Sequence, residues 1–410
     1  MRKFTWRINR VRYYPYLSVS ASPRYLLPLS LVYKQFLRAN KAIALYGLLL
    51  ASVVACQSST TNSQPAKTSE SRLDTQLLLN NAVLQQSNKQ DNTVWKIKAD
   101  NIAYSENRQT ATLDGIVGNL LQNGTVILKL SAKTGKVFND GNSILLEEDI
   151  IVRDTRNGSV ITSKAVEWQP RKNLLLIKEE LSGIRANLQI TAGSGRYFTD
   201  TERLEIEDDV VATTAQPALQ LKSDRLVWNI SGESIASPGA VEIIRYNDER
   251  TITDRLVSDR AEVNLADKSA VLEQNVELVT SKPRLQVATD YLTWNYLERV
   301  GRTNRPIQII DRDRQIGLTG NRGEVDLIQQ IAKLDNGVRG INQQEISELY
   351  ARQLTWNMDT EEVEAIGDVV YEQADPPASL TGDKAKGTIT NNKIVVTSNG
   401  KQQVTTVIEN

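Results

Sequence analysis

The residue types that most often carry enzyme chemistry are scarce in this chain of 410 residues. It has no histidine, which removes the commonest general base and the commonest metal-binding side chain. Its single cysteine, Cys56, cannot form an intrachain disulfide or a thiolate metal cluster. The remaining candidates are carboxylates, which gather in clusters such as Glu147–Asp149 and Glu205–Asp209.

These carboxylates suggest two kinds of site, and neither is well supported. Calcium binding needs a loop in which glycine spaces the ligands, and the clusters lack one. A glycosidase needs two carboxylates flanking a sugar, and nothing in the sequence marks such a pair as buried. Gly193 and Gly195 precede no expected helix, so a phosphate-binding loop is not predicted either. We expect solvated acids in turns, no enzyme activity, no metal and no cofactor.

Aromatic residues are spaced much more regularly than the acids. With Trp228 as reference, equivalent positions recur at steps of 33, 31, 29, 31, 35, 31, 31, 31 and 31 residues. A small residue stands five positions before each of them, as Ser223 stands before Trp228. Asn or Asp follows five successive ones directly, as in Asn229. We call these positions the first anchors: Tyr104, Val137, Trp168, Tyr197, Trp228, Val263, Trp294, Val325, Trp356 and Gly387.

A second apolar row lies 13 residues after the first. The intervals from this row to the next first anchor are 20, 18, 16, 18, 22, 18, 18, 18 and 18, all even. Side chains on a strand alternate between two faces, so residues added in pairs keep the inward set inward. The spacing therefore predicts hairpins of variable length. These second anchors are Val117, Ile150, Leu181, Val210, Val241, Val276, Ile307, Val338 and Val369.

The pattern predicts an all-β fold: a long, open, V-shaped antiparallel β-jellyroll built from hairpin repeats of about 31 residues. We expect a single elongated body over residues 73–400, although residues 73–86 are ambiguous between helix and strand. If the sheet folds over, its inner face forms an apolar trough. Burial is worth about 0.8 kcal/mol per methylene, so such a trough favours hydrocarbon chains.

The N-terminal segment predicts attachment to a membrane. Residues 1–55 contain nine Lys or Arg and no acid, and residues 42–55 are uncharged. "VVAC", ending at Cys56, resembles the lipobox of bacterial lipoproteins, in which the cysteine is acylated. The alternative is an uncleaved anchor helix. We expect a signal segment at 1–55, a flexible tether at 56–72 and a disordered tail at 401–410.

The charge of the body argues against one class of partner. Beyond residue 55 the chain carries 40 Lys or Arg against 49 Asp or Glu, so this part is acidic. Nucleic acid binding requires a basic face, and none is predicted.

The units "SDRLVWN…PGAV", "TDYLTWN…RPI" and "ARQLTWN…IGDVV" resemble the OstA/LptA/LptC-like repeat of lipopolysaccharide transport. With the N-terminal attachment, the chain looks like an extended LptC. The resemblance implies a non-enzymatic periplasmic protein anchored to the inner membrane of a Gram-negative-type bacterium. It would take lipopolysaccharide from the LptB–LptF–LptG transporter and pass it to an LptA-like bridge protein by end-to-end strand pairing. The body is about twice the usual LptC length, and a lipobox replaces the usual uncleaved helix.

The resemblance also implies which residues touch the lipid. Strands near residues 73–85 would meet the transporter's jellyroll, and the segment from Lys384 would offer an edge to the next protein. Basic side chains at the trough mouth are candidates for lipid phosphates, and the sequence selects none of them. The implied lipid contacts are the inward anchors Trp168, Tyr197, Trp228, Trp294, Trp356, Val210, Val241, Val276, Ile307, Val338 and Val369.

Two other functions fit the same repeats. One is a β-solenoid surface lipoprotein that binds polysaccharide or protein, and the other is a lipid or lipoprotein carrier acting alone. Solvent-facing aromatic ladders would favour the solenoid, whereas an apolar lumen would favour transport.

Overall fold

The computed structural model describes residues 77–88, 93–389, 393–398 and 405–407. The chain divides at Ser71 and Arg72 into two units, and all described residues belong to the second. The predicted signal segment, the lipidation candidate Cys56 and the predicted tether lie outside the described residues. In the part that is described, no helix has the length and apolar character needed to cross a membrane.

The described residues form strands, with two short 3-10 turns, η2 (Asn139–Gly141) and η3 (Pro170–Lys172), and no α-helix. The prediction of an all-β fold is confirmed. The first half comprises β1 (Leu78–Asn88), β2 (Thr93–Tyr104), β3 (Thr110–Gln122), β4 (Thr125–Phe138), β5 (Ser143–Asp154), β6 (Val160–Gln169), β7 (Leu174–Glu179), β8 (Leu181–Arg185), β9 (Leu188–Ala192), β10 (Ser194–Phe198), β11 (Arg203–Thr214), β12 (Leu219–Asn229), β13 (Ser234–Ser237) and β14 (Val241–Tyr246).

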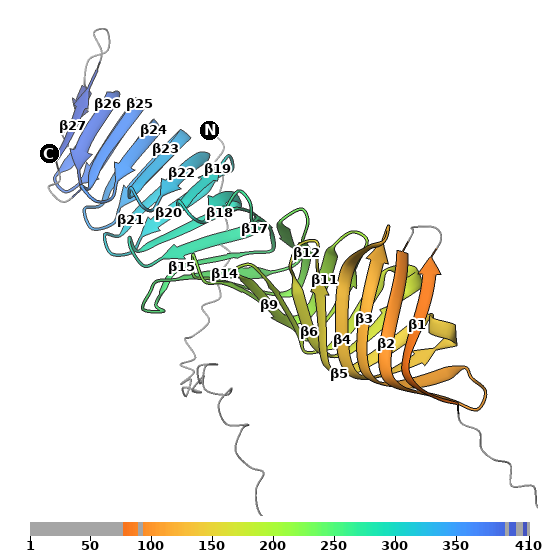
Figure 1. Cartoon of the computed structure of the whole chain (residues 1–410). Coiled ribbons are helices and arrows are strands. Elements are labelled where there is room, and N and C mark those ends of the chain that lie inside the picture. The colour runs from red at the N-terminus through yellow and green to blue at the C-terminus, as the bar shows by residue number, and fades with distance from the viewer. Residues whose placement is uncertain (1–76, 89–92, 390–392, 399–404, 408–410) are drawn as a thin grey trace, which may run out of the picture. The chain divides into compact units, whose positions relative to one another are not determined.

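The second half continues in the same way from Ile252 (Figure 1). It comprises β15 (Ile252–Ser258), β16 (Arg260–Asn264), β17 (Ser269–Thr280), β18 (Leu285–Asn295), β19 (Val300–Thr303), β20 (Ile307–Asp311), β21 (Ile316–Gly320), β22 (Arg322–Asp326), β23 (Ile331–Asn342), β24 (Ser347–Asn357), β25 (Glu362–Ala374), β26 (Pro377–Thr388), β27 (Lys393–Thr397) and β28 (Thr405–Val407).

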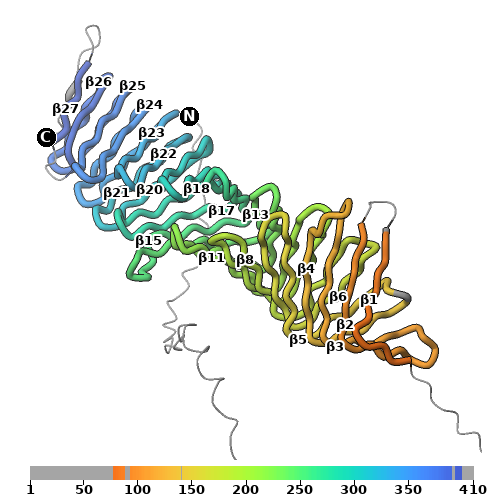
Figure 2. Tube along the Cα trace, viewed as in Figure 1, coloured from red at the N-terminus to blue at the C-terminus, as the bar shows by residue number. Residues whose placement is uncertain are grey.

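All these strands belong to one antiparallel sheet with two walls. On β11 and β12, Arg203–Glu207 pairs with Arg225–Asn229, and Val210–Thr214 pairs with Leu219–Ser223. We call the wall that carries the first anchors the A wall and the other the B wall. Shorter strands belong to one wall only: β6 pairs with β7 in the A wall and with β8 in the B wall. Figure 2 follows the trace as it runs to and fro between the two walls.

The walls meet at a crease that left-handed backbone angles produce. In β11, φ is 71° at Asp208 and 53° at Asp209, and the register with β12 shifts between Glu207 and Val210. Asn, Asp and Gly adopt this conformation at the lowest steric cost. The acidic or turn-like residue before a second anchor is therefore a bend, and φ is positive at Asp149, Glu180, Asp209, Asn275, Gly337 and Asp368.

Small residues complete the crease from the opposite strand. Val210 pairs with Ser223, Val276 with Thr289 and Val338 with Ala351. The Ser223 hydroxyl donates to the carbonyl oxygens of Arg225 (3.1 Å) and Ala240 (2.9 Å). Backbone groups left unpaired by the bend thus gain a partner, which a buried carbonyl needs. Room is also limited: Gly382 pairs with Val369, and a Cβ on Gly382 would lie 2.6 Å from the Val396 side chain.

Replacing Asp209 tests this account of the crease. Asp209→Val should lower the free energy of unfolding by about 2 kcal/mol, because a β-branched residue is strained at positive φ. Asp209→Gly should be neutral or slightly stabilising. Urea unfolding of the two variants measures the difference. Equal stability of the valine and glycine variants would contradict it.

The first anchors form one row across the A wall. Leu204 pairs with both Tyr197 and Trp228, and Ala270 pairs with both Val263 and Trp294. The row of first anchors therefore continues from strand to strand across the A wall. The Asn or Asp after an anchor starts the turn, as predicted: Asn295 Oδ1 accepts the backbone N–H groups of Leu297 and Glu298 at 3.0 and 2.9 Å.

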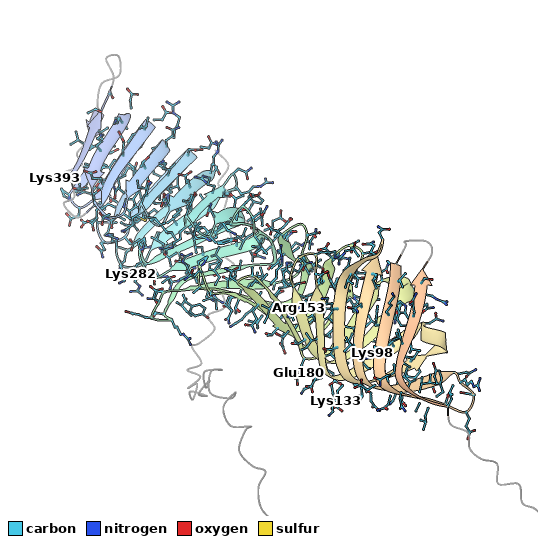
Figure 3. All side chains as sticks on the ribbon, viewed as in Figure 1. Lys98, Lys133, Arg153, Glu180, Lys282 and Lys393 are labelled. Atoms are coloured by element: carbon cyan, nitrogen blue, oxygen red, sulfur yellow. The ribbon has the colours of Figure 1, made fainter. Side chains whose placement is uncertain are left out.

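The outer face is charged. Lys98, Lys133, Arg153 and Glu180 are exposed there (Figure 3). Cross-strand ion pairs join oppositely charged neighbours, as at Arg255 and Glu242 (2.6 Å). The acidic cluster at Glu205–Asp209 is divided between this face and the crease. Glu205 lies on the outer face, where it pairs with Arg196 and Arg203 at 2.6 Å each. Asp208 and Asp209 lie at the crease. No group of acids that could hold a metal ion occurs within the described residues.

One outer carboxylate predicts acid sensitivity. The Lys178 ammonium (2.7 Å), with Gln169 and Ser143, lowers the pKa of Glu167 to about 2. A lowered pKa in the folded state gives stability that is present above about pH 4.3 and is lost as pH falls toward 2. Since the pair is partly solvated, we expect a loss of only about 1 kcal/mol. Glu167→Gln and Lys178→Met should each flatten this part of the acid unfolding curve, and an unchanged curve in both would refute the assignment.

The two ends of the sheet settle one expectation and correct another. The ambiguous segment near 73–86 is strand β1 from Leu78 onward, so it belongs to the sheet. The disordered tail predicted at 401–410 is wrong for Thr405–Val407, which form β28 on β26. The reason is that β27 covers only Lys384–Thr388 of β26, which leaves Ser379–Thr381 free to pair with β-branched residues.

Gly387 is an anchor without a side chain for a local reason. A Cβ there would lie 2.5 Å from the Lys393 carbonyl oxygen of β27. The close approach of β27 therefore excludes an aromatic residue at this position, and no packing from a partner is needed to explain the glycine.

Candidate functional site

The candidate site is the space between the A and B walls. The five aromatic first anchors predicted to touch lipid are at most 3% exposed, and they belong to one apolar cluster with the predicted second anchors. This cluster extends from Trp95 on β2 to Val396 on β27. The structure therefore brings all eleven predicted residues to the interior: Trp168, Tyr197, Trp228, Trp294, Trp356, Val210, Val241, Val276, Ile307, Val338 and Val369.

This interior is apolar but is not empty. Side chains from the two walls fill much of it, and free volume gathers in cavities. A cavity of about 230 Å³ lies near Trp95 and Tyr104, and one of about 100 Å³ lies near Val363 and Ile394. The central cavity has a volume of about 400 Å³ and is lined by two first anchors, Trp228 and Val263. A guest that occupied the whole anchor row would have to part the walls.

Three of the buried tryptophans place an indole N–H in this apolar interior, where the described part of the chain provides it with no hydrogen-bond acceptor. The indole N–H groups of Trp168, Trp228 and Trp356 are buried and have no hydrogen-bond acceptor among the described residues. An unpaired buried donor costs about 1–3 kcal/mol. A guest with an ester, amide or hydroxyl oxygen would satisfy it.

Strand alternation already places Ile230 on the face of Trp228, but sequence reasoning missed Trp95, Tyr296 and Met358 as interior residues. Trp95, which is outside the anchor register, packs against Trp168 with ring centroids 5.4 Å apart and joins the walls near β1. Ile230, Tyr296 and Met358, each two residues after an anchor, are buried where the A-wall strands turn. The signal was present, because an apolar residue follows the turn Asn at each of these positions.

The open side of the V is closed by polar bridges between strand tips. We call this line the seam. At its first bridge, the Tyr197 hydroxyl donates to Asp154 (2.6 Å), and Arg156 lies 3.5 Å from Glu202. Burial, followed by the charge of Asp154, raises the pKa of Tyr197, so the phenol remains a donor.

Three further bridges follow along the seam. Arg185 pairs with Glu233 at 3.1 Å. Arg299 contacts Asp254 through two bonds of 3.0 and 2.5 Å, and Arg245 donates to the Tyr296 carbonyl at 2.6 Å. Arg314 contacts Glu361 at 2.9 Å and the Met358 carbonyl at 3.2 Å. In each bridge the B-wall group precedes its A-wall partner by 43 to 51 residues.

Aromatic residues on the solvent face are rare. Tyr350 is the one aromatic among the exposed large apolar side chains in the part of the chain that is described. The tryptophans there are buried instead, so the arrangement has an apolar interior and no exposed aromatic ladder.

An apolar interior between two walls, with a charged exterior, is the arrangement expected of a lipid-transport jellyroll. A family model described as "Lipopolysaccharide-assembly, LptC-related" matches residues 43–192 and 240–343, more than half of the chain. The chain belongs to this LptC-related family. No curated protein matches it.

Family membership implies a role in lipopolysaccharide transport. LptC-related proteins form a periplasmic, inner-membrane-associated transport family that is not known for catalysis.

Proposed function

We propose that this LptC-related chain is a non-enzymatic periplasmic bridge that carries the acyl chains of lipopolysaccharide from an inner-membrane ABC transporter toward the outer membrane. The chains would lie between the A and B walls along the anchor rows. The observation that carries this proposal is the unbroken row of paired apolar positions, from Tyr104 to Ile394, in a chain of this family.

The energetics of the row favour movement as well as binding. Each methylene placed between the walls gains about 0.8 kcal/mol. Successive anchors offer nearly the same apolar surroundings, so a chain that moves from one to the next meets a nearly flat free-energy profile. Parting the walls costs contacts and seam bridges, and the energy input of a transporter would supply this cost.

Strand edges support the proposed partners. Among the described strands, β1 pairs only with β2, and β27 pairs only with β26. Unpaired edges accept a strand from another protein through main-chain hydrogen bonds. We assign β1 to the LptF/LptG jellyroll and β27 to an LptA-like bridge protein. At this end the edge is formed by β27 and β28, which each pair only with β26, whereas β26, which contains Lys384, is paired on both sides.

The N-terminal part of the proposal concerns residues outside the described ones. Cys56 would be acylated, or residues 42–55 would remain as an uncleaved anchor, and residues 56–72 would tether the body to the inner membrane. Radiolabelled palmitate incorporation that is lost in Cys56→Ser separates these two forms of attachment.

Photo-crosslinking in cells tests the proposal. A photoreactive residue at Trp228 or Trp294 should give adducts with lipopolysaccharide. Val227 and Thr293 are matched controls, because each is the direct neighbour of an anchor and its side chain faces away from the interior. Absence of adducts at both anchors, or equal labelling at the controls, would reject transport through this interior.

A further inference from the structure

The polar bridges of the seam follow one position of the repeat. From Tyr197 to Trp356, the fifth residue after each first anchor ends the A-wall turn and has positive φ: 52° at Glu202, 50° at Glu233, 57° at Lys268, 57° at Arg299, 55° at Gln330 and 59° at Glu361. Facing B-wall groups have the opposite charge wherever a bridge forms. Arginines meet Glu202, Glu233 and Glu361, and Asp254 meets Arg299. The two rims are thus matched in charge.

At Lys268 the two rims are not matched in charge. It is exposed, its ammonium donates to the Leu265 carbonyl oxygen, and the described residues place no carboxylate within ion-pair distance of it. The central cavity reaches the surface at this point, since its lining includes Lys268, Leu265 and the tip residues Gln216 and Pro217 of the B wall. The seam is therefore unbridged where the central cavity lies.

A second position on the seam, near Gln330, has no polar bridge in the described part of the chain and is nevertheless closed. The tips near Gln330 also lack a polar bridge among the described residues. However, Leu285 and Leu327 beside these tips are buried, and neither lines the central cavity. Apolar packing closes the seam there, so an absent bridge alone does not make an opening.

The cavity below Lys268 has the character of a ligand site. Its volume of about 400 Å³ lies within the range of about 300–1,000 Å³ typical of ligand pockets. Trp228, Ile235 and Val263 supply apolar walls, and the Trp228 indole N–H is a buried donor without an acceptor. Leu297, 54% exposed, extends the apolar surface at the mouth.

We infer that the trough opens sideways at Lys268, through a port that admits a hydrocarbon chain of an amphiphile whose anionic head group pairs with the Lys268 ammonium. The inference rests on the proposed transport function and specifies where along the trough the amphiphile enters or leaves. The four polar bridges, together with the apolar packing of Leu285 and Leu327, keep the rest of the seam closed. The orphan N–H of Trp228 would donate to an oxygen near the head of the amphiphile.

The test compares Lys268→Glu with Lys282→Glu in the full-length chain in cells. Both lysines are exposed and lie at strand tips, but Lys282 lines no part of this cavity. A photoreactive residue at Leu297 reports lipopolysaccharide at the port, and one at Trp294 reports it between the walls. Lys268→Glu should reduce the Leu297 adduct about fivefold. Lys268→Arg should retain the adduct, and Lys282→Glu should leave it unchanged.

The outcomes separate the port from the transport proposal. Adducts at Trp294 with none at Leu297, or Leu297 adducts that are unaffected by Lys268→Glu, would overturn the port and leave transport standing. Absence of adducts at both Trp228 and Trp294 would overturn transport itself. A fall of equal size in Lys268→Glu and Lys282→Glu would also overturn the port, because it would show a general charge effect.

Discussion

A single alanine inserted after Leu292 should unfold the middle of the sheet, whereas a Thr-Val pair inserted at the same place should be tolerated. Leu292 and Trp294 alternate inward on β18, Tyr296 follows directly after its end, and all three are buried. One added residue turns Trp294 and Tyr296 toward water, and losing one buried aromatic side chain costs about 3–5 kcal/mol. The single insertion should therefore cost more than about 5 kcal/mol.

The two-residue insertion restores the alternation and displaces Trp294 by only one pair along the strand. We expect a loss of about 2 kcal/mol from the mismatched tip. An elongated sheet of this kind unfolds in segments, so hydrogen exchange of β17–β19 is a better measure than a global transition. Equal protection in the two insertion variants would show that the even spacing has no structural basis.

Asp254→Asn should destabilise the centre of the seam by about 3–5 kcal/mol. Asp254 is 1% exposed and accepts two hydrogen bonds from Arg299, with Arg245 3.9 Å away. Burial lowers the pKa of Arg245, and the charge of Asp254 opposes this shift. Removing the carboxylate leaves two partly buried guanidinium groups without a counter-charge. An unpaired buried charge destabilises the folded state more than the loss of both partners does.

Glu242→Gln is the matched control for this prediction. Glu242 also pairs with an arginine, Arg255, but on the solvated outer face, where such a pair is worth about 0–1 kcal/mol. The double variant Asp254→Leu with Arg299→Leu should recover most of the loss, since it removes charge from both rims. Urea unfolding measures all three variants. A similar small effect of Asp254→Asn and Glu242→Gln would mean that the seam does not stabilise the closed walls.

Much of the fold follows from local rules that act over a few residues. Strand alternation is one such rule, so the even intervals between Val210, Trp228 and their equivalents predict hairpins and an inward row. Turn chemistry is another: it predicts a turn at Asn295, whose side chain accepts two backbone N–H groups. The conformational tolerance of Asp209 likewise marks the bend between the walls.

Three features of the interior could not be predicted in this way. The pairing of Arg185 with Glu233, the isolation of Lys268 and the cavity beside Trp228 all depend on which B-wall tip meets which A-wall tip. That match is set by how far the sheet folds at its crease and how its strands twist. Neither quantity is encoded within one repeat.

The sequence by itself determined which residues face inward and that they form one row, because side-chain alternation along a strand is a property of the local backbone. Only the tertiary structure decided that the walls close on each other, where polar bridges hold them and where a cavity remains. These outcomes depend on contacts between groups 43 to 51 residues apart, and charge and volume at such contacts are matched only after the two walls have met.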